Sequence, residues 1–423
     1  MNKRTAKIGI AVSLAIIIPA IIYLVYNSST ALAAPSITKD PNLKVETLVN
    51  GLNSPTSMAF IDNNNILVLE KGGQVRLVSN GVLQGKPVLE VSTNTESERG
   101  LLGIAMMNGM KTGDNTISNN NNRFVFLYYT ESNGGDLRNR VYRYDWNAQT
   151  QTLINPTLIL DLPALPGPNH DGGKLVIGPD HYLYAVIGDL NHRGKLQNII
   201  DGTDPDDTSV IFRVNPNDGS AAPGNPFIND PNVKMHKYYA YGIRNSFGIT
   251  FDPITGNLWQ TENGPDVYDE INIVKPAFNS GWIKVMGPLS RNADVNINNE
   301  LVNYPGSHYT DPVFSWKNPV AVTDIEFMKS SALGQKYKNN IFVGDYNNGN
   351  LYYFELNDTR TGIKPEPGLS GLVIDNDNQL SAVTFGTGFG AISDIKTGPK
   401  DGFLYVLSIN DGTIYKIVPS STK

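Results

Sequence analysis

A short segment in which apolar and polar residues alternate recurs six times along the chain, and each copy ends in a polar turn. After each copy come two strongly β-prone stretches joined by Gly, Asn or Asp. Such alternation bounded by turn residues is typical of β-strands and hairpins. The alternating segments cover residues 55–62, 101–108, 173–180, 246–253, 322–329 and 392–399, and the predicted hairpins cover 66–78, 124–146, 183–200, 258–274, 341–356 and 404–418. After the first 34 residues we find almost no sustained helical periodicity, so we expect few helices.

The sixfold recurrence predicts an all-β fold, a six-bladed β-propeller formed by residues 35–423 as one domain. The early strand 43–49 has no hairpin of its own, so we expect it to complete the last blade and close the ring. A pair of β-sandwiches is the alternative, but it does not explain six copies. The Asn-rich stretch 111–123 and the long segment 282–316 are expected to be surface insertions.

Residues 1–34 carry the features of a signal peptide or signal anchor. Three positively charged residues precede an uncharged apolar run of 19 residues, 8–26, and Ala31-Leu32-Ala33 fits a cleavage site. The run is also close to the ~20 residues that span a bilayer, so residues 8–26 could remain as a membrane anchor. Both interpretations place the rest of the chain outside the cytoplasm, secreted or held at the outer face of the cell membrane.

Charge and cysteine content narrow the classes of partner. Removal of residues 1–33 takes away three positive charges and no negative ones, which changes the formal net charge from −6 to −9. A surface of that sign does not attract nucleic acid through its overall field. The chain has no cysteine, so burial alone must stabilise the exported domain. We therefore expect a small-molecule partner and no nucleic acid.

The candidate chemistry lies beside the predicted inner strands. In a propeller these strands line a central channel, so residues that precede them in consecutive blades converge on one axis. Glu98 precedes the second inner strand, His170 the third, and Arg244 and Asn245 the fourth. The ordinary pKa of histidine suits a general base at neutral pH, and Asp189 ends the adjacent strand within reach of the imidazole. A structural loop histidine is the alternative interpretation.

The hairpin 261–272 is a second candidate, because carboxylates crowd around its Gly264-Pro265 turn. Carboxylate oxygens and exposed backbone carbonyls are ligands that Ca²⁺ prefers. The acidic and amide residues of the hairpin are Glu262, Asp266, Asp269, Glu270 and Asn272. The hairpin lacks the ligand spacing of an EF-hand loop, so a hydrated acidic turn stays as the alternative.

These blocks together resemble a known family. The stretches NHDGGKLVIGPD (169–180) and YGIRNSFGITFDPITGNLWQTENGPDVYDEIN (241–272) are similar to the soluble PQQ-dependent glucose/sorbosone dehydrogenases. ERGLLGIA (98–105), IFVGDYNNGNLYYFEL (341–356) and the segment 394–417 resemble other blades of that family. The match runs in order over most of residues 43–418. It implies a six-bladed propeller, in agreement with the repeat pattern.

The resemblance implies an exported sugar dehydrogenase that depends on PQQ and Ca²⁺. Such an enzyme oxidises the C1 hydroxyl of an aldose by hydride transfer to the quinone, and an external acceptor then takes the electrons. His170 stands where the family has its catalytic base, and Asp189 matches the residue that supports this histidine. Arg244 and Asn245 match residues beside the quinone carbonyls and the sugar, and Glu98 matches a polar sugar contact.

The resemblance also implies a metal position. Gly264 and Pro265 match the pair whose backbone carbonyls hold the Ca²⁺ that polarises the cofactor. Asp269, in the same hairpin, is a further candidate ligand.

The chain departs from the family where the carboxylates of PQQ are bound. The family places an Arg-x-Arg before its last inner strand, where this chain has Ala391 and Ser393. Asn347 and Asn348 stand where a basic residue is expected in the fifth blade, and Lys317 or Lys396 are the candidate substitutes. Carboxylates without cationic partners lose much of their binding free energy.

This departure keeps two other function classes open. One is a non-catalytic propeller that binds a glycan or a surface protein. The other is a Ca²⁺-dependent lactonase, which would need side-chain carboxylates from several blades around the channel, whereas the acidic residues here cluster in one hairpin.

Overall fold

The computed structural model describes residues 34–112, 115–117, 123–366, 369 and 371–420. The predicted signal segment and the apolar run 8–26 lie outside this range, so both stay predictions. Within the part of the chain that is described, no helix is long and apolar enough to cross a membrane.

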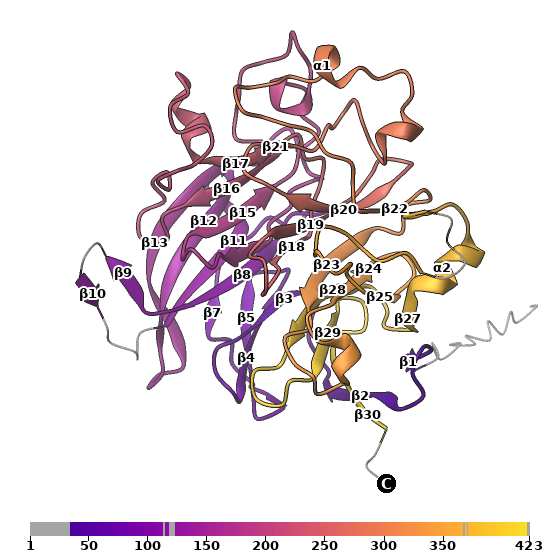
Figure 1. Ribbon diagram of the computed structural model, residues 1–423. Coiled ribbons are helices and arrows are strands. Elements are labelled where there is room, and N and C mark those ends of the chain that lie inside the picture. Colours follow the sequence, from indigo (N-terminus) through magenta and orange to yellow (C-terminus); the bar gives the residue numbers. More distant parts are fainter. Residues whose placement is uncertain (1–33, 113–114, 118–122, 367–368, 370, 421–423) are drawn as a thin grey trace, which may run out of the picture. The chain divides into compact units, whose positions relative to one another are not determined.

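Six β-sheets arranged as the blades of a propeller make up the fold, as the sequence predicts (Figure 1). Blade 1 comprises β3 (Pro55–Phe60), β4 (Asn65–Glu70) and β5 (Gln74–Ser79), with β6 (Val82–Leu83) and β7 (Leu89–Glu90) both beside β5. Blade 2 comprises β8 (Leu101–Asn108), β11 (Arg123–Asn133), β12 (Asp136–Asn147) and β13 (Thr152–Pro163). Blade 3 comprises β14 (Leu175–Ile177), β15 (Leu183–Ile187), β16 (Val210–Val214), β17 (Tyr238–Tyr241) and β21 (Phe278–Asn279).

The second half of the chain forms the other three blades. Blade 4 comprises β18 (Gly248–Phe251), β19 (Leu258–Glu262), β20 (Asp269–Val274), β22 (Phe314–Trp316) and β26 (Val373–Ile374). Blade 5 comprises β23 (Val322–Phe327), β24 (Ile341–Asp345), β25 (Leu351–Phe354), β27 (Thr384–Thr387) and β1 (Ser36–Ile37). Blade 6 comprises β28 (Ile392–Thr397), β29 (Leu404–Ser408), β30 (Thr413–Pro419) and β2 (Leu43–Val49).

Short elements fill the connections between blades. They are the hairpin of β9 (Met110–Thr112) and β10 (Asn115–Ile117), the helices α1 (Ile297–Glu300) and α2 (Asp377–Val383), and the 3₁₀ turns Lys195–Gln197, Val233–Lys237, Leu289–Arg291 and Gln335–Tyr337. The Asn-rich insertion, predicted to be a loop, thus contains two short strands. The long segment 282–316, predicted to be a surface insertion, contains α1, and its last three residues form β22.

The first strand of each blade lines the centre of the ring. β8 contacts β3 and β14, β23 contacts β18 and β28, and β28 contacts β3, which completes the circle. These are the six alternating segments identified in the sequence. Residues that directly precede them therefore meet at one end of the central channel.

Aspartates set the polar turn that follows the inner strand in four blades. A side-chain oxygen of Asp62 accepts a hydrogen bond from the backbone N–H of Asn64 at 2.8 Å, and Asp252 accepts one from Ile254 at 2.9 Å. Asp180 and Asp401 make the same contact two residues ahead. A carboxylate that satisfies the backbone in this way favours a tight turn over continued extension. The recurring Asp at the end of the alternating segment is therefore a cause of the hairpins.

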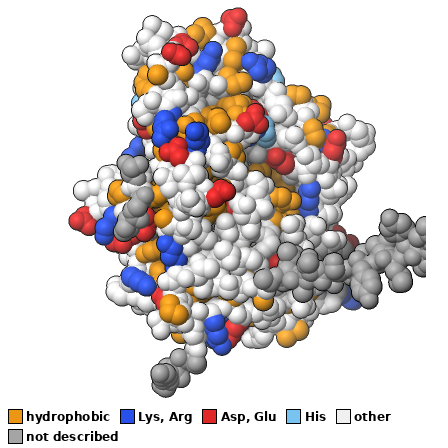
Figure 2. Space-filling model, turned by 90° about the vertical axis from the view of Figure 1, so that its right-hand side faces the viewer, with side chains coloured by type: hydrophobic (Ala, Val, Ile, Leu, Met, Phe, Trp, Pro, Cys, Tyr) orange, Lys and Arg blue, Asp and Glu red, His pale blue; other side chains and the backbone are white. Residues whose placement is uncertain are grey.

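The hydrophobic core is divided among the interfaces between neighbouring blades. Phe126 and Leu183 share one cluster between blades 2 and 3, and Ile325 and Trp259 share another between blades 4 and 5. Four further clusters join the remaining pairs of blades. Both faces of each blade are therefore covered by its two neighbouring blades. On the outer face in Figure 2, positive and negative side chains are interspersed.

Strand β2 closes the ring, as the sequence predicts. It pairs antiparallel with β30, with Val45 opposite Ile417, so blade 6 takes its outer strand from the N-terminal end of the domain. β1 pairs with β27 in the same way and completes blade 5. Two blades are thus tied to a segment that is distant from them in sequence.

One predicted hairpin is wrong in its second half. The predicted partner of β15 lay within 183–200, but β15 pairs with β16 at residues 210–214. The intervening residues form a loop organised by the buried side chain of Gln197, which accepts a hydrogen bond from the N–H of Gly194 and donates to Thr208 and Ser209. Polar groups of this segment are satisfied by hydrogen bonds to a buried side chain and not by pairing with another strand.

The closure by β2 makes a testable prediction. Leu43 is 6% exposed and packs with Tyr415 and Ile417, so Leu43→Ala should lower the free energy of unfolding by about 2–4 kcal/mol through the lost burial and the cavity. Lys44→Ala, on the exposed side of the same strand, should change it by less than about 0.5–1 kcal/mol. Urea denaturation of the two variants measures the difference. Equal midpoints would mean that β2 does not stabilise the ring.

Candidate active site

A cavity of about 440 Å³ lies at the end of the channel where the inner strands begin. Its lining includes seven of the eight residues singled out from the sequence: Glu98, His170, Arg244, Asn245, Gly264, Pro265 and Asp269. The eighth, Asp189, contacts His170 from behind. Residues from blades 2, 3 and 4 are therefore brought together in one site.

His170 is held by a buried carboxylate. Its Nδ1 lies 2.6 Å from Oδ1 of Asp189, so the proton on Nδ1 is shared with the carboxylate and Nε2 is left as the acceptor. The other oxygen of Asp189 accepts a hydrogen bond from Nε1 of Trp282 at 2.6 Å. No described residue forms a hydrogen bond with Nε2 of His170. The ring therefore has a fixed tautomer and one basic nitrogen available in the cavity.

The loop before β14 owes its shape to its glycines. Gly172 has φ +62°, and a Cβ there would lie 2.8 Å from the carbonyl oxygen of Val186. The loop can therefore pack directly on β15. Because Asp189 follows the same strand β15 in sequence, this packing helps to set the distance between His170 and its partner.

Glu98 joins three blades at the mouth of the channel. Its Oε2 accepts hydrogen bonds from the backbone N–H of His170 at 2.7 Å and from the side-chain amide of Asn245 at 3.0 Å. The carboxylate thus fixes the loop of His170 to that of Asn245.

Arg244 and Asn245 each present a polar atom without a hydrogen-bond partner among the described residues. Arg244 donates from Nη1 to the carbonyl of Asn263 at 3.0 Å, and its guanidinium lies over the ring of Trp282. Its Nε and the Oδ1 of Asn245 are buried without a hydrogen bond. Burial lowers the pKa of Arg244 from its ordinary value. Buried polar atoms of this kind are nearly always satisfied, so this part of the cavity suits a polar ligand.

Glu262 and Glu270 are structural carboxyls of the predicted metal hairpin. Glu262 accepts hydrogen bonds from the backbone of Arg244 and the hydroxyl of Ser280, and Glu270 from Gly287 and Asn272. Burial raises the pKa of Glu262 to about 7 and, together with the charge of Glu262, raises that of Glu270 to about 8. Asp266 is exposed. Among the described residues, no group of three His, Cys, Asp or Glu side chains could hold a metal ion.

The Gly264-Pro265 turn is rigid and leaves its carbonyls available. Asp269 accepts hydrogen bonds from the N–H groups of Gly264, Val320 and Val322 through both of its oxygens. No described residue donates a hydrogen bond to the carbonyl oxygens of Gly264 and Pro265. Asp269 therefore holds the turn in place, while the two carbonyls remain as potential ligands.

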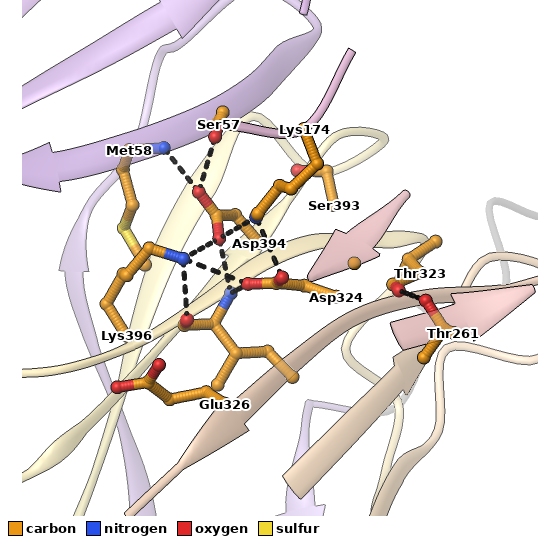
Figure 3. Close-up of polar contacts among 12 residues, drawn as sticks. Ser57, Met58, Lys174, Thr261, Thr323, Asp324, Glu326, Ser393, Asp394 and Lys396 are labelled. Atoms are coloured by element: carbon orange, nitrogen blue, oxygen red, sulfur yellow. Dashed lines mark hydrogen bonds and ion pairs between the residues drawn. The ribbon is translucent and has the colours of Figure 1, made fainter. Parts of the chain in front are cut away.

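Beneath the cavity lies a group of four charged residues that we call the floor quartet: Lys174, Asp324, Asp394 and Lys396 (Figure 3). Lys396 contacts both aspartates and does not line the cavity, and neither does Lys317. Neither of the two lysines considered as substitutes for the missing arginines therefore lines the cavity.

Sequence analysis missed two cations in the cavity. Among the described residues, the Lys and Arg side chains in its lining are Lys71, Lys174 and Arg244. Lys174 directly follows the two glycines of the His170 loop, a position that could have identified it. Lys71 follows β4 in a Gly-rich turn, and a lysine in such a turn does not by itself indicate a binding site.

Known proteins are similar to this chain over much of its length. The family model described as "Glucose / Sorbosone dehydrogenase" matches residues 52–416. Aldose sugar dehydrogenase YliI of Escherichia coli is 26% identical over 423 residues, covering 94% of this chain and 97% of that protein. Quinoprotein glucose dehydrogenase B of Acinetobacter calcoaceticus is 31% identical over 275 residues, covering 59% of this chain and 54% of that protein.

A solved structure shares the fold. The PQQ-bound form of aldose sugar dehydrogenase from Streptomyces coelicolor matches with a TM-score of 0.62 and 23% identity, covering 91% of this chain and 99% of that chain. At this identity the similarity concerns the fold alone. The family model, in contrast, spans most of the sequence, and on that ground the chain belongs to the glucose/sorbosone dehydrogenase family.

Proposed function

We propose that the protein is an exported sugar dehydrogenase that uses PQQ and Ca²⁺ to oxidise the C1 hydroxyl of an aldose. The observation that carries the proposal is the His170–Asp189 pair, with Nε2 available in a cavity that also presents Arg244 and Asn245. The relatives named for aldose sugar or glucose dehydrogenase activity support the substrate class.

The residues of the cavity suit a planar quinone that carries carboxylates. Arg244 and Asn245 offer a donor and an acceptor without partners beside His170. Leu102, Phe247 and Ile392 give apolar wall. The lining also contains Lys71 and Lys174, the second of which is paired with Asp324 and Asp394. When bound, the quinone supplies the hydride acceptor that the side chains cannot. Lys71 and Lys174 also weaken the case for a non-catalytic propeller, which was based on the missing arginines.

His170 acts as the general base. Its Nε2 accepts the proton of the C1 hydroxyl as hydride leaves C1, which converts the alcohol carbon to a carbonyl carbon. Asp189 keeps the proton on Nδ1 and stabilises the imidazolium that forms. The buried guanidinium of Arg244 stabilises negative charge that develops next to it, and its effect is strengthened by the low dielectric of the site. Glu98, beside both loops, is placed for a sugar hydroxyl.

The backbone carbonyls of Gly264 and Pro265 are the proposed Ca²⁺ ligands on the protein, and Asp269 acts chiefly by holding their turn. Two neutral carbonyls do not bind Ca²⁺ tightly alone, because the ion takes six to eight oxygen ligands. The remaining ligands must come from the cofactor and water, so metal and cofactor are expected to bind together.

Export follows from the predicted signal segment in residues 1–34, and reoxidation of the cofactor needs an external electron acceptor. Whether residues 8–26 are cleaved or retained as an anchor decides between a secreted and a membrane-attached enzyme. Amino-terminal sequencing of the native protein distinguishes the two.

His170→Gln is expected to lower kcat by about 10²–10⁴-fold because it removes the base. Asp189→Asn should act in the same direction, since the amide cannot hold Nδ1–H in the same way. His192 also lies beside a carboxylate, with Nδ1 2.9 Å from Asp206 but without a hydrogen bond, and it does not line the cavity. His192→Gln is therefore the matched control and should keep full activity. Steady-state kinetics with an aldose and a dye acceptor measures the effect. Near-normal activity in His170→Gln would refute the assigned base.

Calorimetric titration with PQQ tests the metal and cofactor assignments. Binding near one equivalent is expected with Ca²⁺, and chelation should weaken it at least about tenfold. Gly264→Ala places a Cβ 2.0 Å from the carbonyl oxygen of Val267, so it should distort the turn and reduce the effect of Ca²⁺. Gly85→Ala, with no atom within 4 Å, is the control. Absence of PQQ binding with Ca²⁺ present would overturn the proposed function.

A further inference from the structure

The floor quartet connects the cavity to the centre of the ring. Lys174 precedes β14, Asp324 lies on β23, and Asp394 and Lys396 lie on β28, so three blades contribute (Figure 3). The Nζ of Lys174 lies 2.8 Å from both Asp324 Oδ1 and Asp394 Oδ1, and the Nζ of Lys396 lies 3.0 Å from Asp324 Oδ2 and also contacts Asp394. Both aspartate side chains are completely buried. The quartet holds two positive and two negative charges and is balanced.

The two aspartates differ in how well they are satisfied. Asp394 accepts hydrogen bonds from the hydroxyl of Ser57 and the N–H of Met58 in addition to its two lysines. Asp324 accepts hydrogen bonds only at Oδ2, from Lys396 and the N–H of Ile395, and its Oδ1, although 2.8 Å from Nζ of Lys174, is buried without a hydrogen bond. The lysines therefore hold the pKa of Asp394 well below its ordinary value against the effect of burial, whereas burial raises the pKa of Asp324 to about 7. Asp324 is the member of the quartet that accepts a proton most readily.

Lys174 is the member that reaches the cavity. It is part of the lining, and its ammonium has three N–H donors. One donates to Asp394, and Oδ1 of Asp324 lies 2.8 Å from the nitrogen as an ion pair without a hydrogen bond, so at least one donor remains for a ligand. Ser57, Thr323 and Ser393 are also in the lining. The hydroxyl of Ser57 already donates to Asp394 and that of Ser393 to the carbonyl of Pro55, whereas the hydroxyl of Thr323 is buried without a hydrogen bond and can donate to a carboxylate.

A carboxylate that binds at Lys174 would disturb the balance of charge. It would add one buried negative charge to a group whose positive charges are already paired, and an unbalanced buried charge is strongly unfavourable. A proton taken up from solvent restores the balance, leaving two lysines with Asp394 and the ligand carboxylate as the negative partners.

We propose that Lys174 binds a carboxylate of the cofactor at the floor of the cavity, and that this binding is coupled to the uptake of one proton by Asp324. The inference rests on the proposed function for the identity of the ligand, a carboxylated quinone. It explains how a chain without the Arg-x-Arg of its family accommodates that group. In this proposal Lys174 contacts the ligand, whereas Asp324 affects ligand binding through its ion pair with Lys174.

The surroundings of Asp324 support this choice of proton acceptor. Lys174 faces it from blade 3, Lys396 and Asp394 from blade 6, and Glu326 lies two residues along its own strand. The hydroxyl of the uncharged Thr261, from blade 4, donates a hydrogen bond to the backbone carbonyl of Thr323. Glu326 accepts a hydrogen bond from the exposed Lys329, so it is already compensated.

The coupling has a definite sign in pH. Because ligand binding raises the pKa of Asp324 above its value of about 7 in the free protein, affinity is highest below pH 7. Above pH 7 the affinity falls, by at most about tenfold per pH unit, until the pKa of the complex is reached. Most of the uptake is therefore expected between pH 7.5 and 9.

The test is calorimetric titration of the Ca²⁺-loaded protein with PQQ at pH 8 in two buffers with different ionisation enthalpies. The difference in apparent enthalpy gives the number of protons taken up, and we expect a value approaching one. The affinity should fall about tenfold or more from pH 7.5 to 9. Asp324→Asn should abolish both the uptake and the pH dependence and should bind PQQ more tightly than the unmodified protein at pH 9.

Asp171→Asn is the matched control. Asp171 is buried, burial raises its pKa to about 7, and it does not line the cavity, so the uptake should persist in this variant. PQQ binding without proton uptake, or uptake that persists in Asp324→Asn, would overturn the inference and leave the proposed function intact. Absence of binding at every pH would overturn both. If Asp324→Asn does not fold, the proton count and the pH dependence of the unmodified protein still decide.

Discussion

The antiparallel pairing of β2 with β30 joins the beginning of the domain to its last blade, and the geometry of the site depends on the closed ring that results. The inner strands meet around one axis because each blade packs on two neighbours through an apolar interface. Loops that precede these strands then have little freedom, and Glu98, His170 and Asn245 come within hydrogen-bonding distance although they belong to three blades. The ring is thus the scaffold that fixes the base, and the loops only need to supply the side chains.

Charge inside the ring is arranged in two ways. Around His170, the buried carboxylates have specific partners: Asp189 accepts hydrogen bonds from His170 and Trp282, and Glu262 accepts one from the backbone of Arg244. In the floor quartet, two lysines and two aspartates balance each other's charge collectively. The specific partner of His170 fixes the tautomer of its imidazole ring. In the proposal made above, the charge state of the quartet responds when an anion binds, which a set of unpaired arginines would not do.

The sequence predicts the fold well because the signals are local and repeated. Alternation locates all six inner strands, and turn aspartates follow four of them. The strand after β15 was misplaced because the loop before it is held by Gln197, whose buried hydrogen bonds leave no pattern in the sequence. For the site, the position of a residue before an inner strand sufficed to find His170, Arg244 and Asn245. The role of Lys174 could not be predicted, because it depends on Asp324 and Asp394, which are far away along the chain. Likewise, nothing in the sequence indicates that both oxygens of Asp269 are taken by backbone N–H groups.

The central claim is that His170 removes the C1 hydroxyl proton of an aldose while hydride leaves the same carbon. The most direct measurement is the rate of PQQ reduction in a single turnover of the reconstituted protein, followed by absorbance, with an aldose that carries hydrogen or deuterium at C1. The account predicts reduction by the aldose, slower with deuterium. Reduction without an isotope effect in a turnover limited by chemistry, or no reduction with PQQ bound, would contradict it.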